Sequence, residues 1–488
     1  MNSELDKIII FIIIMGATMS IVFADDSATK VSERHRMIVL TDIEADPDDT
    51  QSLVRLLLYA NEIDIQGIVA TTSTWKRTSI APESIHQLID TYEKVHANLV
   101  LHDPAYPNAD SLRSLVKSGR PEYGMGGVGE GKDTEGSDWI IEALDRDDYR
   151  PLWISVWGGA NTLAQALHTL RATRPADEVD RLVAKLRVYT ISDQDDSGPW
   201  MRKEFPGLFY IVTPGGDYGS ATWTGINNVI DGIDNTTISN AWLAENIQQG
   251  HGPLGAAFPD VSWGVEGDTP AYLNLIPNGL SNPEHPDWGG WGGRYEFYEP
   301  EVPVTDPKTF LGGVPIPQES RPIWTNANDK YFPVESPEYG RATRVGAEPF
   351  EGFKVSLWRW RDDFQNDFAA RMDWTVTSYD EANHPPVVVL DHPETMTVVS
   401  GDGFGVSARG TYDPDGDSLS FVWLHYPEAG TYPDLVRVNG AENDKGAWIT
   451  APEVEKPETL HFIVRVTDKG SPALSRYNRV IVTVLPVQ

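Results

Sequence analysis

Five carboxylates crowd into the short stretch that follows the first apolar run after residue 35. They are Asp42, Glu44, Asp46, Asp48 and Asp49, within the segment TDIEADPDD. Like charges at this density repel one another, and a bound divalent cation would relieve the repulsion. Because the chain contains no cysteine, thiolate ligands are excluded, and oxygen ligands point to calcium before zinc. The segment therefore predicts a calcium site.

Part of this negative charge has a structural explanation. Asp48 and Asp49 would occupy the first turn of the following helix, whose positive end favours carboxylates. Asp42 and Glu44 instead fall at the end of a buried strand, where an unpaired charge is costly. Adjacent helical residues diverge by about 100 degrees, so Asp48 and Asp49 cannot both face one ion. We expect one of the two to address a substrate.

The elements that must position these residues alternate between strands and helices. Short apolar runs predict strands, and amphipathic stretches predict helices. The predicted strands are residues 37–40, 63–70, 152–157 and 186–191, and the predicted helices are residues 50–60, 82–96, 160–170 and 362–371. This alternation predicts an α/β fold with a mostly parallel sheet covered on both faces. Ligands should bind beyond the carboxyl ends of its strands, where the loop-rich residues 196–328 are expected to wrap the sheet.

The pattern becomes all-β near Asn383. The predicted strands are residues 387–390, 404–408, 420–424, 459–466 and 479–485. Roughly a hundred residues of this kind suit a β-sandwich, with Trp423 in its core. His384 and two following prolines are predicted to form a short stiff linker. The acidic turn at residues 413–417 is either a plain turn or a second calcium site, and its composition alone favours the plain turn.

Composition and charge exclude several classes of partner. The 39 basic and 72 acidic residues give a net charge of -33, which makes nucleic acid and anionic lipid unfavourable partners. Residues 8–23 are almost wholly apolar, but they are fewer than the about 20 residues that span a bilayer. Residues 1–24 are predicted to be a signal peptide cut after Ala24, with an uncleaved anchor as the alternative. We expect a secreted or periplasmic bacterial protein without a stable membrane span after cleavage.

The acidic segment resembles the opening motif of the nucleoside hydrolases, in which a strand is followed by DTDPGxDD and a helix. The resemblance implies three roles by position. Glu44 would be both a calcium ligand and the base that activates the attacking water. Asp48 would bind sugar hydroxyls, and Asp49 would chelate the ion. The longer side chain of Glu44, where the family has Asp, is a departure from the motif.

Two later segments extend this resemblance. In WGGANTLAQAL, the similarity to the family's GPLTN turn implies that the Trp157 carbonyl reaches the metal and that Asn161 binds sugar. In GDTPAYLNLI, the similarity to the family's HDPLA segment makes Asp268 the final calcium and sugar ligand. The histidine that acts as leaving-group acid in some members is Gly267 here, which argues against nucleosides as substrates.

The chain is more similar to one branch, the secreted bacterial proteins described as cellulose-binding. They pair a nucleoside hydrolase-like domain with a C-terminal Ig-like domain. The segments ISDQDDSG, EGDTPAYLNLIPNGL and WGGWGGRYE carry this similarity together with TDIEADPDD. The resemblance implies a Rossmann-like domain at residues 25–382, an Ig-like β-sandwich at residues 383–488, and a carbohydrate partner. It implies no oligomeric state.

Further residues could contact sugar or supply a proton. Trp288 and Trp291 alternate with paired glycines, a pattern that suits either stacking on a sugar face or a tightly turned core. Asp193 follows a predicted strand and is a candidate sugar-binding residue. A glycosidase needs a pair of carboxyl groups, and the candidates for the missing acid are Asp193, Asp195, Asp196, Glu266 and His251.

The main prediction is a secreted hydrolase of N- or O-glycosyl bonds that acts on sugars from plant or algal polysaccharides. Calcium held by Glu44, Asp49 and Asp268 would acidify a water. Glu44 would accept its proton, while Asp48 and Asp193 hold the sugar hydroxyls. The alternative is a non-catalytic polysaccharide-binding protein on the same scaffold, and nucleoside hydrolysis is the third possibility.

Overall fold

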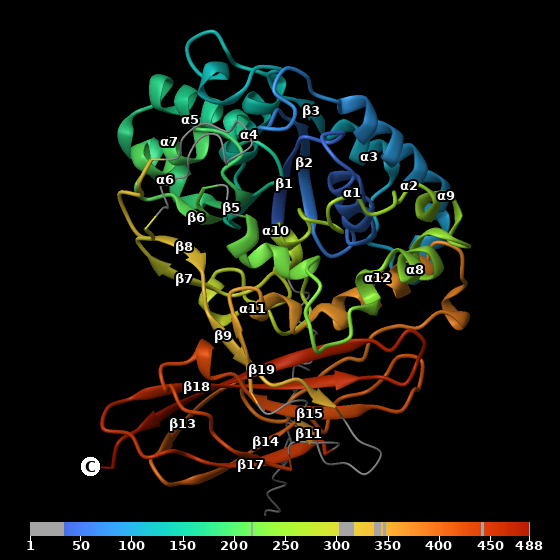
Figure 1. Cartoon of the computed structure of the whole chain (residues 1–488), viewed down its shortest axis with the longest axis vertical. Coiled ribbons are helices and arrows are strands. Elements are labelled where there is room, and N and C mark those ends of the chain that lie inside the picture. The colour runs from blue at the N-terminus through green and yellow to red at the C-terminus, as the bar shows by residue number, and fades with distance from the viewer. Residues whose placement is uncertain are drawn as a thin grey trace, which may run out of the picture. The chain divides into compact units, whose positions relative to one another are not determined.

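An eight-stranded sheet organises the α/β part of the chain (Figure 1). Its strand order is β3-β2-β1-β4-β5-β6-β8-β7, and only the β7–β8 pair is antiparallel. The strands are β1 (Arg36–Thr41), β2 (Asp64–Ala70), β3 (Val116–Ser118), β4 (Leu152–Val156), β5 (Leu186–Ser192), β6 (Phe209–Thr213), β7 (Tyr295–Tyr298) and β8 (Ile323–Asn326). The predicted α/β fold with a mostly parallel sheet is confirmed.

This computed structural model describes residues 34–215, 218–301, 317–335, 343–344, 348–440 and 444–487. The predicted signal peptide, residues 1–24, lies outside the described residues. From Arg34 onward the chain forms one unit. Within the described ranges, no helix is both long and apolar enough to cross a membrane.

Helices cover both faces of the sheet. They are α1 (Asp48–Leu58), α2 (Pro82–His102), α3 (Ala109–Ser114), α4 (Glu135–Asp145), α5 (Asn161–Thr173), α6 (Ala176–Lys185), α7 (Ser197–Glu204), α8 (Asn240–Leu243), α9 (Gly252–Ala256), α10 (Pro270–Leu273), α11 (Val355–Trp358) and α12 (Arg361–Asp373). Successive strand residues point to opposite faces. Ile38 and Leu40 of β1 accordingly pack with α4 to α7, whereas Met37 and Val39 pack with α1, α2 and α12. This burial on both faces explains why β1 reads as a continuous apolar run.

The order of the strands marks the place where a ligand should bind. From β1 the chain builds β2 and β3 on one side and then returns to build β4, β5 and β6 on the other. In open α/β sheets, ligands occupy the crevice beyond the carboxyl ends of the strands at this switch point. The acidic segment leaves the carboxyl end of β1, and Trp157 leaves that of β4, so both border this crevice.

The C-terminal part consists of two β-sheets. The strands are β13 (Thr395–Val399), β14 (Gly403–Ser407), β15 (Ser420–His425), β16 (Val438–Asn439), β17 (Gly446–Thr450), β18 (Glu458–Thr467) and β19 (Ser475–Leu485). They form a sheet ordered β13-β19-β18-β15, with a parallel β13–β19 pair, and an antiparallel sheet ordered β14-β17-β16. Trp423 is buried among them, as predicted. The Ig type of this sandwich stays a prediction.

Two local predictions for this part were wrong. Residues 387–390 form only an isolated bridge at Val387, because Val389 donates its backbone N–H to the Thr411 hydroxyl and not to a neighbouring strand. His384 does not belong to a free spacer. It is buried, its ring stacks on Tyr379 at 4.0 Å, and it hydrogen-bonds Asp415. The connection is therefore packed into the structure, while the predicted boundary at residue 383 stays a prediction.

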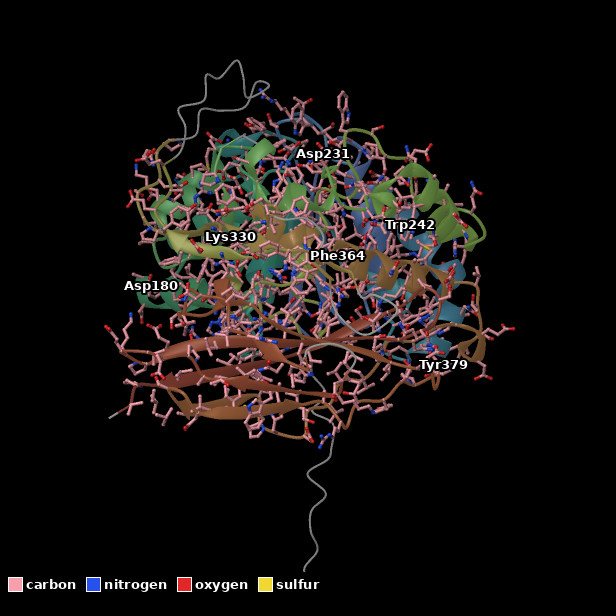
Figure 2. The ribbon with its side chains drawn as sticks, turned by 60° about the horizontal axis from the view of Figure 1, so that its bottom comes forward. Asp180, Asp231, Trp242, Lys330, Phe364 and Tyr379 are labelled. Atoms are coloured by element: carbon pink, nitrogen blue, oxygen red, sulfur yellow. The ribbon has the colours of Figure 1, made fainter. Side chains whose placement is uncertain are left out.

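The α/β part and the sandwich share a buried core. Tyr426 and Tyr477 of the sandwich belong to the same hydrophobic cluster as the residues around α1 and α12. Phe364 of α12, labelled in Figure 2, is fully buried and contacts Trp291 edge-on. The indole N–H of Trp291 in turn donates to the Tyr477 hydroxyl at 3.2 Å. Each part thus completes the core of the other. The remaining short strands are β9 (Asp329–Tyr331), β10 (Val334–Glu335), β11 (Thr343–Arg344) and β12 (Phe350–Gly352).

Candidate functional site

A pocket of about 690 Å³ lies at the predicted edge of the sheet. Its wall includes residues that follow β1, β2 and β4, with Ile191 of β5 and residues of the loops between β6 and α10. Among the described residues, five aspartates contribute to it, namely Asp42, Asp46, Asp48, Asp49 and Asp268. Aromatic side chains contribute as well, namely Trp75, Trp157, Tyr218, Trp223 and Trp263. The pocket therefore combines a strongly acidic region with an aromatic one.

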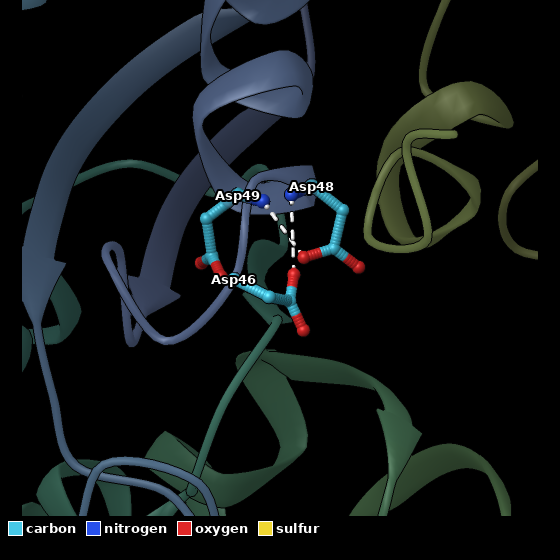
Figure 3. Close-up of side chains that lie close together, drawn as sticks. All are labelled: Asp46, Asp48 and Asp49. Carbon is cyan, nitrogen blue, oxygen red and sulfur yellow. Dashed lines mark hydrogen bonds between the residues drawn. The ribbon is translucent and has the colours of Figure 1, made fainter. Parts of the chain in front are cut away.

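The loop between β1 and α1 brings three carboxylates together. Oxygens of Asp46, Asp48 and Asp49 lie within 4.8 Å of one another (Figure 3). The Asp48 N–H donates to Asp46 at 3.2 Å, and the Asp49 N–H donates to Asp48 at 3.0 Å, which holds the group at the first turn of α1. The Thr41 hydroxyl donates to Asp49. Despite their divergence on the helix, Asp48 and Asp49 both line the pocket.

Asp268 reaches the same pocket from a distant part of the sequence. It precedes α10 and is only 2% exposed. Its Oδ2 has no hydrogen-bond partner among the residues that the structure describes. Burial raises the pKa of Asp268 well above its usual value, and the negative charges of Asp48 and Asp49 raise it further. A buried carboxylate oxygen without a donor is a group that a cation would satisfy.

The other carboxylates of the pocket are perturbed in the same direction. Burial raises the pKa of Asp42 to about 6. It also raises the pKa values of Asp48 and Asp49 well above the usual value, with further increases from neighbouring aspartates. The Lys76 ammonium lowers the pKa values of Asp42 and Asp49 but is itself paired with Glu44. This donor set of crowded, partly desolvated oxygens fits a hard divalent cation.

The raised pKa values predict how the metal-free protein responds to pH. A carboxyl group whose pKa is higher in the folded than in the unfolded state destabilises the fold once it is ionised. For Asp42 this loss develops as the pH rises from 3.8 to about 6. In a chelator, Asp42→Asn should therefore melt at a higher temperature than the wild type at pH 7, with the difference shrinking by pH 4. A difference that grows toward low pH would contradict this assignment.

The structure does not support the predicted role of Glu44 as ligand and base. Its backbone adopts a positive φ of 78°, and its side chain is 54% exposed. Lys76 donates to it at 2.8 Å and the Ser84 hydroxyl at 2.5 Å, and these two hydrogen bonds lower its pKa. Glu44 is absent from the wall of the pocket, and Asp46 stands in the cluster instead.

A matched pair of substitutions tests this reassignment. Asp46→Asn removes a charge inside the cluster, and Glu44→Gln removes one from a solvent-exposed ion pair. We expect Asp46→Asn to weaken the binding of a divalent cation about tenfold or more, and Glu44→Gln to change it by less than about threefold. Titration calorimetry on chelator-treated protein measures both. The opposite ranking would restore Glu44 as the ligand.

Three further predicted site residues have different outcomes. Trp157 lines the pocket and is fully buried, and its carbonyl accepts a hydrogen bond from the Gln194 amide at 2.7 Å. Asp193 does not line it, because both of its oxygens accept from the buried Arg202 at 2.8 and 2.9 Å. Asn161 does not line it either, since it donates to a backbone carbonyl at 2.7 Å in the protein interior. Asp193 and Asn161 are therefore not in the wall of this pocket, and their predicted sugar contacts stay an untested prediction.

Trp288 and Trp291 are also away from the pocket. Trp291 is completely buried. Trp288 stacks on His285 at 4.0 Å and contacts His461 of the sandwich edge-on. The intervening turn requires glycine at residue 289, which has a φ of 75° and where a Cβ would lie 2.7 Å from the Tyr426 hydroxyl. The Trp-Gly segment is thus tightly turned, with Trp291 in the core and Trp288 partly buried, and its predicted sugar contacts stay an untested prediction.

None of the proposed proton donors lines the pocket. Glu266 forms a buried pair with Arg55, with a shortest separation of 2.5 Å. Asp195 accepts the Ser197 N–H at 2.9 Å, Asp196 accepts the Met125 N–H at 2.7 Å, and His251 contacts Asp373 at 2.8 Å. At Gly267, a Cβ would lie 2.6 Å from Asp48 Oδ2. A histidine there would therefore require Asp48 to move.

Apart from Trp157, the aromatic side chains of the pocket escaped the sequence analysis. Trp223 is buried and donates to the Ser192 hydroxyl at 3.3 Å, whereas Trp75 is 42% exposed. Trp263 is 99% exposed and has a φ of 67°. Left-handed backbone costs energy in residues other than glycine and clusters at functional sites. The available signal was the position of Trp223 and Trp263 in the loop-rich stretch expected to wrap the sheet.

Comparisons with known proteins agree with this architecture. A family model described as cellulose-binding Sde182, nucleoside hydrolase-like domain, matches residues 36–295. A second, described as cellulose-binding protein Sde0182, C-terminal domain, matches residues 403–484. No curated protein matched the chain.

One solved structure is similar over nearly the whole chain. It is described as a nucleoside hydrolase-related hypothetical protein from Saccharophagus degradans that is associated with carbohydrate metabolism. It is 34% identical, with a TM-score of 0.76, and the match covers 92% of this chain and 100% of that one. The effector proteins XOO4466 and XopQ, the latter complexed with adenosine diphosphate ribose, are 12% and 13% identical. Their TM-scores are 0.29 and 0.26, with coverage of 70% and 51% of this chain and 94% and 68% of theirs, and they carry no argument. The chain belongs to the family of cellulose-binding Sde182 proteins with a nucleoside hydrolase-like domain.

Proposed function

We propose that the chain is an exported, calcium-dependent hydrolase of glycosyl bonds that acts on saccharides derived from polysaccharide. One observation carries the proposal. Five aspartates from two distant segments converge in one pocket whose wall also bears exposed tryptophans. The family description as cellulose-binding supports a saccharide ligand. The predicted signal peptide at residues 1–24 supports export.

Calcium is the cation that fits this donor set best. The cluster offers carboxylate oxygens only, and the chain has no cysteine. Asp42, Asp46, Asp49 and Asp268 are the proposed ligands, and Trp157 lines the same pocket. When bound, calcium supplies positive charge that neutralises these groups and makes a nearby water more acidic. Calcium would give the buried Oδ2 of Asp268 the partner that it lacks among the described residues.

Residues of the pocket are also assigned to substrate binding and proton transfer. Asp48, half-buried and still lining the pocket, is placed to accept hydrogen bonds from sugar hydroxyls. Asp46 takes the position in the cluster that the resemblance gave to Glu44, and we assign it the proton of the attacking water. Asn227 and Asn228 add amide donors and acceptors to the wall. Trp75 and Trp263 offer exposed aromatic surface to the apolar face of a sugar ring.

A substrate screen tests the proposal directly. Chromogenic pentosides and hexosides, cello-oligosaccharides, inosine and uridine are incubated with the full chain, with added calcium or with chelator. We expect calcium-dependent release from a glycoside and none from the nucleosides. Release of free base from a nucleoside would establish the third possibility instead. Hydrolysis that is unchanged in chelator would contradict the metal-dependent mechanism.

Trp263 predicts a separable binding effect. Its side chain is 99% exposed, so Trp263→Ala should leave the melting temperature unchanged. Losing the stacking surface should raise KM for an oligosaccharide about tenfold with little change in kcat, because ground and transition states lose the same contact. Trp448→Ala, which removes a tryptophan that is 54% exposed on the sandwich, is the control. An unchanged KM would remove Trp263 from the site.

The second candidate function is saccharide binding without catalysis. Two observations favour it over a working hydrolase. Glu44, the base in the resemblance, faces solvent, and the family's histidine position is Gly267, with no room for a side chain beside Asp48. In this case calcium would hold the pocket together and the protein would bind cello-oligosaccharides without turnover. Calcium-dependent binding in calorimetry, together with no product in the substrate screen, would decide for this function.

A further inference from the structure

A second pocket, of about 450 Å³, lies where α11 and α12 meet the sandwich. We call it the junction pocket. It shares no lining residue with the acidic pocket. Its size is within the range of ligand pockets, about 300 to 1,000 Å³. Its polar wall contains Arg359, Arg361, Asp362 and Asp363 from the α/β part and Arg465 from β18.

The three arginines of the junction pocket have unused hydrogen-bond donors. The Nε atoms of Arg359, Arg361 and Arg465 are all buried, and none has a hydrogen-bond partner among the described residues. A buried polar group without a partner costs free energy unless a ligand or water satisfies it. Three such donors around one pocket indicate a ligand that offers several oxygen acceptors.

Arg361 is the most deeply buried of the three arginines. It is 1% exposed, and its terminal nitrogens donate to the Asn228 carbonyl at 2.7 Å and the Asn235 side chain at 2.8 Å. Within the described residues it has no carboxylate partner in salt-bridge range, and burial lowers its pKa. Arg359 and Arg465 have only long ion pairs, at 3.5 Å to Asp329 and 3.6 Å to Asp363. Their guanidinium groups retain capacity for a ligand.

Acidic groups in the same wall define the class of ligand. Three aspartates, Asp234, Asp362 and Asp363, face the three arginines around the pocket. The wall therefore has no net charge, and its carboxylates would repel an anion of several charges. Carboxylates accept hydrogen bonds and guanidinium groups donate them. The matching ligand both donates and accepts through many hydroxyl groups and is itself neutral.

We propose that the junction pocket is a second carbohydrate-binding site, which takes a neutral saccharide unit. Ring and hydroxyl oxygens of the sugar accept from the guanidinium groups of Arg359, Arg361 and Arg465, which line the pocket. Its hydroxyls donate to Asp362 and Asp234, which are both exposed to solvent. The site does not rest on the function proposed for the acidic pocket. It would hold a polysaccharide chain on the protein whether or not the acidic pocket is catalytic.

Two accessible side chains provide the test variants. Arg465 is 30% exposed on β18, and Asp362 is exposed at the start of α12, so Arg465→Gln and Asp362→Asn should leave the fold intact. The matched control is Arg171→Gln, which removes a surface arginine that is 42% exposed and paired with Glu204. Calorimetry with cellohexaose on the full chain measures the affinity, and melting temperatures verify the fold.

We expect the wild type to bind cellohexaose and the two pocket variants to weaken that binding about tenfold, with the control within about twofold. Trp263→Ala impairs only the acidic pocket, so this variant should still bind cellohexaose at the junction pocket. Adding Arg465→Gln to Trp263→Ala should then remove that remaining binding. Wild-type affinity in both pocket variants, no binding to the wild type, or loss of all binding in Trp263→Ala would each overturn the proposal. Stronger, Arg465-dependent binding of hexagalacturonate would overturn the choice of a neutral ligand.

Discussion

Asp268→Asn is expected to abolish both calcium binding and hydrolysis. Asp268 is 2% exposed, and within the described part of the chain its Oδ2 has no hydrogen-bond partner and four other aspartates line the same pocket. Asparagine keeps the shape but loses the charge, so the remaining cluster attracts a cation less strongly. We expect turnover to fall by about a thousandfold or more, the scale for losing a group that stabilises charge in the transition state. Initial rates at saturating calcium measure this loss.

Melting temperatures show whether Asp268→Asn loses activity through the site or because the protein unfolds. Without metal, Asp268→Asn should melt at a higher temperature than the wild type at pH 7, because the substitution removes a buried charge whose pKa is raised. With calcium, the wild type should gain stability and the variant should gain little. Asp193→Asn is an unsuitable control, since its partner Arg202 is buried. Glu44→Gln is the better one. Full activity in Asp268→Asn would remove Asp268 from the site.

Tyr477→Ala is expected to destabilise the whole unit from Arg34 onward and not only the sandwich. The ring is 2% exposed and contacts Trp291 and Trp360 edge-on. Its hydroxyl donates to Asp363 and accepts from Trp291. Removing a buried aromatic side chain costs about 3–5 kcal/mol of unfolding free energy. Because the shared core couples the two parts, both should unfold in one transition at lower denaturant concentration.

Trp448→Ala is the matched control for this prediction. Trp448 lies on β17 and is 54% exposed. Its removal should cost less than about 1 kcal/mol, the usual limit for a surface substitution away from special features. Fluorescence and circular dichroism during denaturant unfolding report the two parts. If Tyr477→Ala left a folded α/β part with an unfolded sandwich, the shared core would not be the unit of stability.

Hydrophobic periodicity was sufficient to predict β1, β2, β4 and β5, but β3, β6, β7 and β8 were not predicted. The last three lie within residues 196–328, which were expected to be loop-rich. The run from Met37 to Leu40 is apolar on both faces because helices cover both sides of β1, and that burial is visible in the sequence. The position of the acidic segment at the end of β1 followed directly. Asp48, Asp49 and Asp268 were found through spacing that resembles a known motif, and all three line the pocket.

The direction of a loop side chain could not be predicted in this way. Glu44 has the spacing of a ligand, but a positive φ and the donors Lys76 and Ser84 draw it to the surface. Neither donor is near it in sequence. Asp46 was read as one of several crowded charges, and only the folded loop brings it together with Asp48 and Asp49.

The sequence also could not show which tryptophans are buried and which are exposed. Trp291 and Trp263 are both close to glycines in the sequence, yet one is completely buried and the other is 99% exposed. The difference arises from the sandwich, since Trp291 donates to Tyr477, which is 186 residues away. A pattern read along the chain contains no information about such a partner. The sandwich was predicted as a separate domain, so its part in the core of the α/β part was missed.

Calcium-specific anomalous diffraction from crystals of the full chain grown with calcium tests the central claim most directly. The account predicts one strong peak in the acidic pocket, about 2.3–2.6 Å from carboxylate oxygens of Asp49 and Asp268. Asp46 should lie on the same ion and Glu44 should not. A pocket without a peak at saturating calcium, or a peak only at the acidic turn of residues 413–417, would contradict the account.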